Sequence, residues 1–332
     1  MSTATVQDPG GRVTVDLAIV GAGPTGLFAA YYAGFRGLSV AVVDSLPELG
    51  GQITAMYPEK QILDVAGFPS VKGRDLVEGL VAQAATADPT YLLGRTATDL
   101  VSHDDGVDLT LDDHTCLHAL AVLVTAGIGT FSPRPLPAGD GWQGRGLDFF
   151  VPSFAPYAGK DVVVVGGGDS ALDWAIHLEP VARSVTLVHR RAQFRAHERS
   201  VARLRSSSAR IVTDAEVVEL RGDGWLEEVD VAHDGETETL AAQQLVAALG
   251  FVADLGPIQR WGIETEKRHI VVDERMATTL PRVFAAGDVA EHPGKVRLIA
   301  VGFGEAATAV NNLVPIVQPG AHVFPGHSSE GS

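Results

Sequence analysis

Short apolar runs alternate along this chain with glycine turns and with longer amphipathic segments. Such runs are typical of strands buried on both faces of a parallel sheet, and the longer segments predict helices. Strands that alternate with helices predict an α/β fold. The clearest predicted strands cover residues 16–20, 39–44, 120–124, 161–165 and 184–189.

The first strand opens a unit of strand, glycine turn, helix, strand and acid. Its turn reads GAGPTG. The first glycine permits a tight turn, the second lets the backbone approach a pyrophosphate, and the third lets helix and strand pack closely. The closing acid lies about 20 residues further on and accepts hydrogen bonds from a ribose. The predicted dinucleotide-binding residues of this unit are Gly21, Gly23, Pro24, Thr25, Gly26 and Asp44.

A second unit repeats this order from Asp161, with the turn GGGDSA and the strand SVTLVH. Its second strand runs into two arginines where the first unit has an acid. Arginine accommodates the 2′-phosphate of NADP(H), so the pair predicts a preference over NAD(H) of roughly a hundredfold. The alternative is a solvated basic turn. The predicted NADP-binding residues are Gly166, Gly168, Asp169, Ser170, Arg190, Arg191 and Arg195.

Arginines recur every four residues after this strand, at Arg195, Arg199 and Arg203. This spacing predicts that the three share one face of a helix. The face extends the phosphate site, meets an acidic partner or is simply solvated, and the sequence leaves these three uses open.

The two predicted sites differ in kind, since an acid suits the adenosine half of FAD and arginines suit NADPH. After the first unit, Gly51 allows close approach of the backbone to a flavin, and Gln52 can reach its pyrimidine edge. Tyr57 lies against the ring system or is an ordinary core tyrosine. Near the end of the chain, Asp288 follows a short predicted strand and binds the sugar-like chain of the cofactor, or forms a turn.

Glycines mark the two places where the chain is expected to leave and re-enter the first domain, in TAGIG and in ALGFV. We therefore predict two Rossmann-like, three-layer dinucleotide-binding domains, the second inserted in the first. The FAD-binding domain is discontinuous and covers residues 1–126 and 250–332. The NADPH-binding domain covers residues 127–249.

The chain has 332 residues, with 41 acidic and 25 basic side chains and a net charge of −16, which argues against a nucleic-acid partner. Its one cysteine, Cys116, excludes an internal disulfide or dithiol and favours a reducing, cytoplasmic compartment. No apolar run approaches the roughly 18 residues needed to cross a bilayer, so no membrane association is expected. We expect no metal site.

Together, the stretches GAGPTGLFAAYYAGFRG, DSLPELGGQITAMYPEK, DVAGFP, GGGDSALDWA, HRRAQFRAHE, GFVADLGPI, AAGDV and GFGEAATAVNN resemble the ferredoxin/flavodoxin–NADP(+) reductases of the thioredoxin-reductase-like type. The resemblance is colinear from about Asp16 to Asn312. It implies bound FAD and NADPH and a homodimer, with Asp44 in place of the usual glutamate. The FAD contacts it implies are Asp44, Gln52, Tyr57, Ala97, Phe131, Asp288 and Ser329, with His327 stacked on the flavin together with Tyr57.

Two dinucleotides in one chain imply hydride transfer from NADPH to FAD, followed by release of single electrons. The resemblance implies that the carrier of these electrons is ferredoxin or flavodoxin. The stretch FFVPSFAPYAGK lies where thioredoxin reductases have Cys-x-x-Cys, and it has no cysteine. No general base is expected, because the cofactors carry the reaction. The alternatives are an NADPH-dependent diaphorase or quinone reductase, and a flavin-binding redox sensor.

Overall fold

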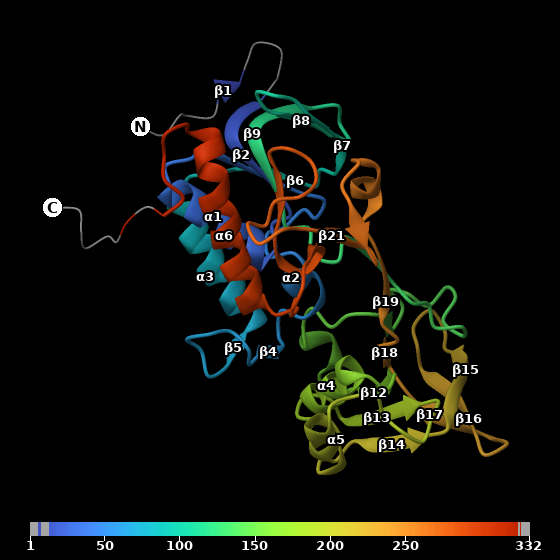
Figure 1. Ribbon diagram of the computed structural model, residues 1–332. Helices are drawn as coiled ribbons and strands as arrows, with labels where there is room; N and C mark the ends of the chain where they lie inside the picture. Colours follow the sequence, from blue (N-terminus) through green and yellow to red (C-terminus); the bar gives the residue numbers. More distant parts are fainter. Residues whose placement is uncertain (1–5, 8–12, 325, 327–332) are drawn as a thin grey trace. The chain divides into compact units, whose positions relative to one another are not determined.

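The computed structural model describes residues 6–7, 13–324 and 326. The chain forms two compact units, of which the first holds residues 1–130 and 253–332 and the second holds residues 131–252 (Figure 1). The predicted α/β class, with the second unit inserted in the first, is confirmed. The assignment of FAD to residues 1–126 and 250–332, and of NADPH to 127–249, stays a prediction.

A parallel sheet in the order β6-β3-β2-β9 is the centre of the first unit. Strands β3 and β9 lie on opposite sides of β2, so the order of the strands reverses beside β2. Such a reversal leaves a crevice at the carboxyl ends of the strands, where ligands bind in open α/β sheets. The strands are β2 (Val13–Val20), β3 (Val40–Asp44), β6 (Thr90–Leu93) and β9 (Cys116–Val124).

Strand β9 has two different partners along one edge. Its first half pairs antiparallel with β8, and its last residues pair parallel with β22. The parallel sheet is thereby extended only at the carboxyl end of β9. The strands at this edge are β7 (Ala97–Ser102), β8 (Val107–Leu111) and β22 (Val283–Ala285).

Helix α1 packs between α3 and α6 beside this sheet (Figure 1). Its buried face consists of glycine, leucine and alanine, and such small side chains allow a close approach of the helix to the strands. The helices of this unit are α1 (Pro24–Phe35), α2 (Gln52–Met56), α3 (Gly73–Ala85) and α6 (Ile299–Val317). The remaining short elements are β1 (Val6–Gln7), β4 (Gln61–Ile62), β5 (Val71–Lys72), β20 (Thr265–Glu266), β21 (His269–Val271), β23 (Ala290–Glu291) and the 3-10 helices η2 (Gly256–Arg260) and η3 (Gly287–Val289).

The second unit has a parallel sheet in the order β11-β18-β12-β13-β14 and a separate antiparallel sheet, β15-β16-β17. Its parallel strands are β11 (Leu147–Asp148), β12 (Asp161–Val165), β13 (Ser184–His189), β14 (Arg210–Thr213) and β18 (Gln244–Ala247). The antiparallel strands are β15 (Ala215–Arg221), β16 (Glu228–His233) and β17 (Glu236–Ala241). The helices are α4 (Asp169–Leu178), α5 (Glu198–Arg205) and the 3-10 helix η1 (Ala155–Tyr157). Where the chain passes between the units, β10 (Thr130–Pro133) pairs with β19 (Phe251–Asp254).

One predicted helical face is wrong. Helix α5 begins at Glu198, so Arg195 precedes it and shares no helical face with Arg199 and Arg203. The backbone N–H of Arg195 instead donates to the carbonyl of Gly167 at 2.7 Å. This bond fastens Arg195 to the glycine turn, because the chain bends back there before the helix starts.

The expectation that no apolar segment approaches membrane-spanning length also needs correction. Among the described residues, α6 has 19 residues and is apolar enough to cross a bilayer by length and composition. The helix packs against α1, where Phe303 lies 5.2 Å from Phe28 between ring centroids. It also carries the buried Glu305. In this structure α6 is therefore a packed helix of the first unit.

Candidate functional site

The first glycine turn follows β2, and the space beside its second glycine is open, as the sequence predicts. Gly21 has a φ of +114°, and a Cβ atom there would lie 2.5 Å from the carbonyl oxygen of Thr125. A Cβ at Gly26 would overlap the carbonyl oxygen of Gly21. Gly23, by contrast, has no atom within 4 Å of such a position. Side chains are thus excluded from the turn while space beside Gly23 stays open.

Helix α1 begins at this open position. Gly23 is its N-cap, no side chain caps the helix there, and Pro24 is its first residue. The first N–H groups of a helix have no partner inside it and carry the positive end of its dipole. The side chain of Thr25 lies instead against Gly287 and Gly302, where a Cβ atom would meet its Oγ1. The start of α1 therefore presents backbone N–H groups to an anion.

The carboxylate of Asp44 holds the turn in place. Its Oδ2 accepts a 2.6 Å hydrogen bond from the N–H of Ala22, and its Oδ1 accepts one of 2.8 Å from Leu46. Burial raises the pKa of this carboxyl group, and the two backbone N–H groups act in the opposite direction. Each carboxylate oxygen has a further lone pair, so Asp44 can still accept from a ribose hydroxyl.

A second glycine pair lies against the first turn. The N–H of Gly50 donates to the carbonyl of Ala22 at 2.9 Å. A Cβ at Gly51, which has a φ of +57°, would lie 2.9 Å from the Cα of Gly23. The next residue, Gln52, begins α2, and its Nε2 lies 3.1 Å from the position of a Cβ at Gly127. The structure therefore brings Gly51 and Gln52 to the carboxyl ends of β2 and β9.

Asp288 lies in η3, just after the carboxyl end of β22. Burial raises the pKa of its carboxyl group, and the nearby cations Lys295 and Arg297 oppose this shift. Burial, and to a smaller extent the charges of Asp288 and Asp64, raise the pKa of the Tyr57 phenol to about 12. The phenol therefore lies close enough to Asp288 to respond to its charge. Tyr57 therefore stays protonated at neutral pH and can donate a hydrogen bond.

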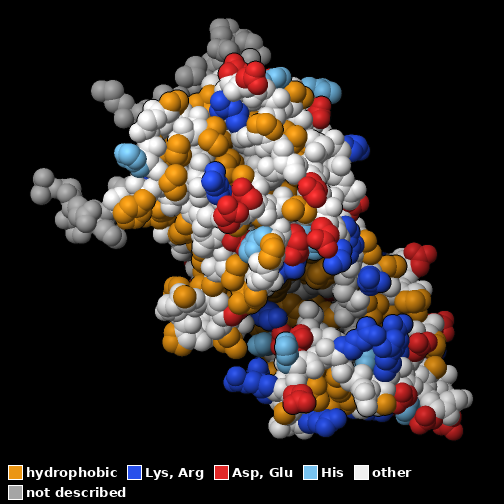
Figure 2. Space-filling model, in the orientation of Figure 1, with side chains coloured by type: hydrophobic (Ala, Val, Ile, Leu, Met, Phe, Trp, Pro, Cys, Tyr) orange, Lys and Arg blue, Asp and Glu red, His pale blue; other side chains and the backbone are white. Residues whose placement is uncertain are grey.

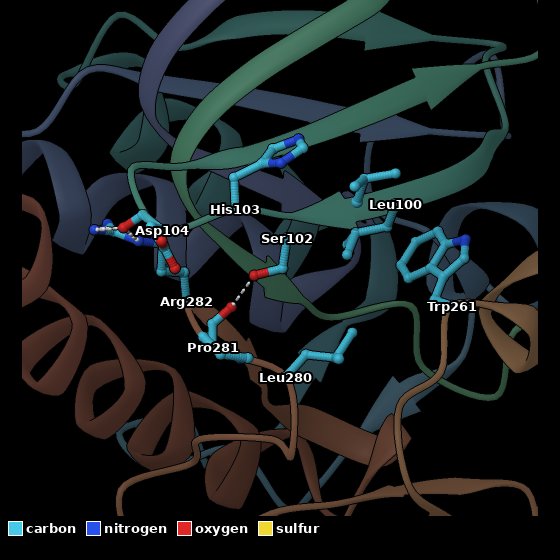
Figure 3. Close-up of a pocket in the computed structure, with 9 residues that line it drawn as sticks. Leu100, Ser102, His103, Asp104, Trp261, Leu280, Pro281 and Arg282 are labelled. Atoms are coloured by element: carbon cyan, nitrogen blue, oxygen red, sulfur yellow. Dashed lines mark hydrogen bonds between the residues drawn. The ribbon is translucent and has the colours of Figure 1, made fainter.

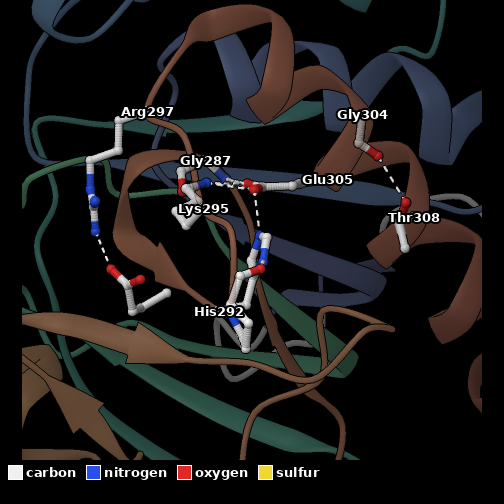
Figure 4. A network of polar contacts seen from close by, with 9 residues as sticks. Gly287, His292, Lys295, Arg297, Gly304, Glu305 and Thr308 are labelled. Atoms are coloured by element: carbon white, nitrogen blue, oxygen red, sulfur yellow. Dashed lines mark hydrogen bonds and ion pairs between the residues drawn. The ribbon is translucent and has the colours of Figure 1, made fainter.

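The turn that carries Asp288 is held by residues to which the sequence analysis assigned no role. Glu305 of α6 and Lys295 of the preceding loop both bond to Gly287 (Figure 4). The sequence contained one signal, since Glu305 is an acid in an otherwise largely apolar helical segment, GFGEAATAV. A buried acid of this kind needs a partner, and the sequence alone does not say which cation supplies it.

The second glycine turn repeats the geometry of the first. Gly166 has a φ of +153°, and its N–H donates to Val188 at 3.0 Å, as Gly21 donates to Val43 at 2.8 Å. Gly168 is the N-cap of α4, without a side-chain cap and with no atom within 4 Å of a Cβ position. Ser170 is exposed at the start of α4. A second open helix N-terminus thus lies after β12.

The strand register shows which residue replaces Asp44 in the second unit. Val20 pairs with Val43 and Val165 pairs with Val188, so the counterpart of Asp44 is His189. A Cβ atom at Gly167 would overlap the His189 ring, which is itself buried. Where the first turn is held by a carboxylate, the second is packed against an imidazole, and the basic residues follow one position later.

Three arginines lie in the loop that folds back over this second turn. The Nε2–H of His189 donates to the carbonyl of Gln193 at 3.1 Å, and the His189 ring stacks on Phe194. Arg190, Arg191 and Arg195 are all exposed. Within the described residues none of the three has an ion-pair partner, although other arginines of this unit do. Lys and Arg side chains are frequent on the visible face of this unit (Figure 2).

Asp169 links the same loop to α4. Its Oδ1 accepts a 2.9 Å hydrogen bond from the N–H of His197. Together with the bond from Arg195 to Gly167, this fixes both ends of the segment 195–197 on the glycine turn. Asp169 therefore has a positioning role that the sequence did not identify.

The remaining predicted residues lie elsewhere or are not described. Ala97 begins β7 and is buried in the core, two residues after Arg95, whose N–H donates to the carbonyl of Asp44. Phe131 lies in β10, and its side chain is outside the described part. His327 and Ser329 lie outside the described residues. The stacking of His327 and the contacts of Ser329 and Phe131 stay predictions.

A cavity of about 380 Å³ lies in the first unit but contains none of the predicted residues (Figure 3). It is at the amino end of β22, whereas Asp288 follows the carboxyl end of that strand. Its polar groups are used inside the protein, since Ser102 donates to the carbonyl of Pro281 and Arg282 donates to that of Asp104. The lining residues are Leu100, Val101, Ser102, His103, Asp104, Trp261, Leu280, Pro281 and Arg282.

Both turns fit the pyrophosphate of a dinucleotide. In each, the second glycine faces open space at an uncapped helix N-terminus, while a Cβ atom there would fill that space. The acid-ended turn offers carboxylate acceptors for ribose hydroxyls, and the arginine-ended turn offers exposed guanidinium groups for an additional phosphate.

Comparisons with known proteins agree with two dinucleotide sites. A family model described as pyridine nucleotide-disulphide oxidoreductase matches residues 15–311. A ferredoxin–NADP reductase of Nocardioides sp. is 74% identical over 96% of this chain and 98% of its own length. One of Saccharopolyspora erythraea is 63% identical over 95% and 97%. Among solved structures, T. acidophilum thioredoxin reductase has a TM-score of 0.77 and 27% identity, covering 90% of this chain and 97% of its own.

Proposed function

Because this chain belongs to the pyridine nucleotide-disulphide oxidoreductase family and, within it, to the ferredoxin–NADP reductases of the thioredoxin-reductase-like type, we propose that it transfers electrons between NADPH and ferredoxin. The first unit binds FAD and the second binds NADPH. When bound, FAD supplies the exchange between a hydride and single electrons. The protein supplies binding, orientation and electrostatics.

The first unit holds FAD through backbone and acid groups. The N–H groups at the start of α1 bind the pyrophosphate, with space provided by Gly23. Asp44 accepts from the adenosine ribose. Gly51 and Gln52 contact the flavin, Tyr57 lies against its ring system, and Asp288 accepts from its ribityl chain. Ala97, Phe131, His327 and Ser329 complete the proposed FAD contacts.

The second unit holds NADPH in the same manner at its glycine turn. The start of α4, with Gly168, Asp169 and Ser170, faces the pyrophosphate. Arg190 and Arg191 bind the 2′-phosphate, and Arg195 is fastened to the glycine turn by its backbone N–H.

The observation that carries this proposal is the contrast between the two turns. Each has the same hydrogen bond from its first glycine to the next strand, but one is followed by Asp44 and the other by His189 and two exposed arginines. One chain therefore offers sites for two different dinucleotides. The chain has one cysteine, so no dithiol within it can relay the electrons.

The test is a visible spectrum of the purified protein, followed by reduction with NADPH or NADH and by steady-state turnover with several acceptors. We expect a flavin spectrum, bleaching by NADPH much faster than by NADH, and efficient reduction of ferredoxin. A colourless protein after reconstitution with FAD contradicts the proposal. Turnover with quinones or oxygen that exceeds turnover with ferredoxin favours a diaphorase, and no turnover with any acceptor favours a redox sensor.

We propose three finer properties. Flavodoxin serves as an alternative carrier, which the same assay tests. The protein is a homodimer, which is supported by the exposed apolar side chains of Phe35 and Val323. A 3.0 Å hydrogen bond from Arg36 to the carbonyl of Val323 ties the segment after α6 to the end of α1. Its compartment is the cytoplasm, supported by the single cysteine. Sedimentation analysis of the mass in solution and cell fractionation test the last two.

A further inference from the structure

A buried ion pair lies beneath the turn that carries Asp288 (Figure 4). The Nζ of Lys295 donates to both carboxylate oxygens of Glu305 at 2.6 Å, and the side chain of Lys295 is only 1% exposed. His292 adds a 3.0 Å contact between its Nε2 and Oε1 of Glu305. Both charges are therefore removed from water and depend on each other.

This pair holds a single residue, Gly287, on both of its backbone polar groups. The N–H of Gly287 donates to Oε2 of Glu305 at 2.8 Å, and its carbonyl accepts from Lys295 at 2.8 Å. Gly287 has a φ of +78°, and a Cβ atom there would lie 2.8 Å from Oγ1 of Thr25. The residue is fixed by α6, by the loop of Lys295 and by α1, and Asp288 follows it directly.

We propose that Lys295 and Glu305 are positioning residues that fix Gly287 and thereby hold the Asp288 carboxylate in place for the ribityl hydroxyl groups of FAD. This inference rests on the proposed function, because it takes FAD as the ligand of the first unit. Neither residue touches the cofactor; each acts through Gly287 and Asp288. We call Lys295, Glu305 and Gly287 the Gly287 clamp.

Stability alone does not account for a clamp of this composition. Removing an ammonium and a carboxylate from water carries a large free-energy cost, and well-packed apolar residues often replace such pairs without loss of stability. A charged pair has a specific use here, because an apolar pair leaves the N–H and the carbonyl of Gly287 without partners. Lys295 also favours the charged form of Asp288, against the effect of burial.

A double-mutant cycle in the full-length protein separates positioning from general support of the fold. The variants are Lys295→Met, Asp288→Asn and the double variant, and the measurement is the Kd of the flavin-free protein for FAD by quenching of flavin fluorescence. We expect Lys295→Met to weaken binding about tenfold when Asp288 is present and less than about twofold when Asp288 is already Asn. Equal weakening in both backgrounds, or none in either, overturns the clamp.

A matched control removes a lysine of the same unit that has no such role. Lys267 is 86% exposed and pairs with Glu266 at 3.0 Å, so Lys267→Met keeps the wild-type Kd. If the control weakens binding as much as Lys295→Met does, the clamp is overturned. A wild-type protein that binds no FAD contradicts the proposed function instead, and this outcome is separate because it precedes every variant.

The pH dependence of the Kd is a second readout that a purely structural role leaves unchanged. The ammonium of Lys295 lowers the pKa of the Asp288 carboxyl, so Lys295→Met should raise that pKa. As the pH falls, FAD binding by Lys295→Met should therefore begin to weaken at a higher pH than binding by the wild type. Superimposable pH profiles contradict the inference. The other charged or titratable groups that act on or respond to Asp288 are Arg297, Glu305, His269 and Tyr57.

If Lys295→Met does not fold, Glu305→Gln provides the same test. The amide oxygen still accepts from the N–H of Gly287, but the negative charge that pairs with Lys295 is gone. We verify by circular dichroism that Glu305→Gln is folded. With Asp288 present, we expect it to bind FAD severalfold more weakly than the wild type. In the Asp288→Asn background, we expect it to leave the Kd of the Asp288→Asn variant unchanged. Unchanged affinity in the first background overturns the clamp.

Discussion

The ring of Phe194 stacks on the ring of His189, with centroids 5.2 Å apart and an angle of 20° between the planes. His189 in turn lies against Gly167, so the loop that carries the arginines is packed onto the glycine turn through one imidazole. The basic residues are thus tied to the open helix N-terminus within one unit. This coupling of the glycine turn and the guanidinium groups is the basis of the first two predictions.

Replacing the two arginines should remove the preference for NADPH. In Arg190→Ala/Arg191→Ala, kcat/KM for NADPH should fall by about a hundredfold while that for NADH changes little, since each charged hydrogen bond contributes about 1.5–3 kcal/mol. Steady-state kinetics with both coenzymes measure the change. The control is Arg210→Ala, because this arginine of the same unit is occupied by Glu238 at 2.7 Å. An equal loss for NADPH and NADH would show that the pair does not read the 2′-phosphate.

Adding one methyl group at Gly167 should disturb coenzyme binding through His189. The Cβ atom would overlap the imidazole ring, so the ring and Phe194 must move. We expect Gly167→Ala to raise KM for NADPH at least about tenfold, with a stability cost of about 1–3 kcal/mol. Adding His189→Ala makes room for the methyl group and should recover part of both losses. No recovery in the double variant refutes steric overlap as the cause.

Neutralising Asp288 should stabilise the flavin-free protein and weaken FAD binding. Burial raises the folded-state pKa of this carboxyl group, so its protonated form is favoured in the fold and wild-type stability falls as pH rises through that pKa. Asn does not titrate. The Tm of Asp288→Asn should equal that of the wild type below about pH 4 and exceed it by a few degrees near neutrality. Thermal unfolding across this pH range tests the sign, and a lower Tm at neutral pH contradicts it.

The arginine face of α5 should serve an acidic protein carrier. Arg199 and Arg203 are exposed on the same side of the helix, and Leu204 anchors the other side. Arg199→Glu/Arg203→Glu should raise KM for ferredoxin severalfold and reduce its salt dependence, with KM for NADPH unchanged. Carrier kinetics at several ionic strengths provide the measurement. If neither KM changes, the face is only solvated.

The repeated order of strand, glycine turn and helix could be predicted from the sequence because it depends on local chemistry. Gly21 and Gly166 are needed where the backbone adopts a positive φ next to a neighbouring carbonyl, and the short apolar runs around them are typical of buried strands. The contrast between Asp44 and the arginine pair is equally local. For these reasons the α/β class and both candidate turns are readable in the chain itself.

Contacts between residues far apart in the sequence were decided only by tertiary structure. Glu305 meets Lys295 and Gly287 because α6 packs beside α1 and β22 joins the sheet next to β9. Arg195 leaves the predicted helical face because its N–H finds the carbonyl of Gly167. Spacing along a chain specifies which residues share a local element, but burial and long-range hydrogen bonds determine where an element starts and which buried charges become partners.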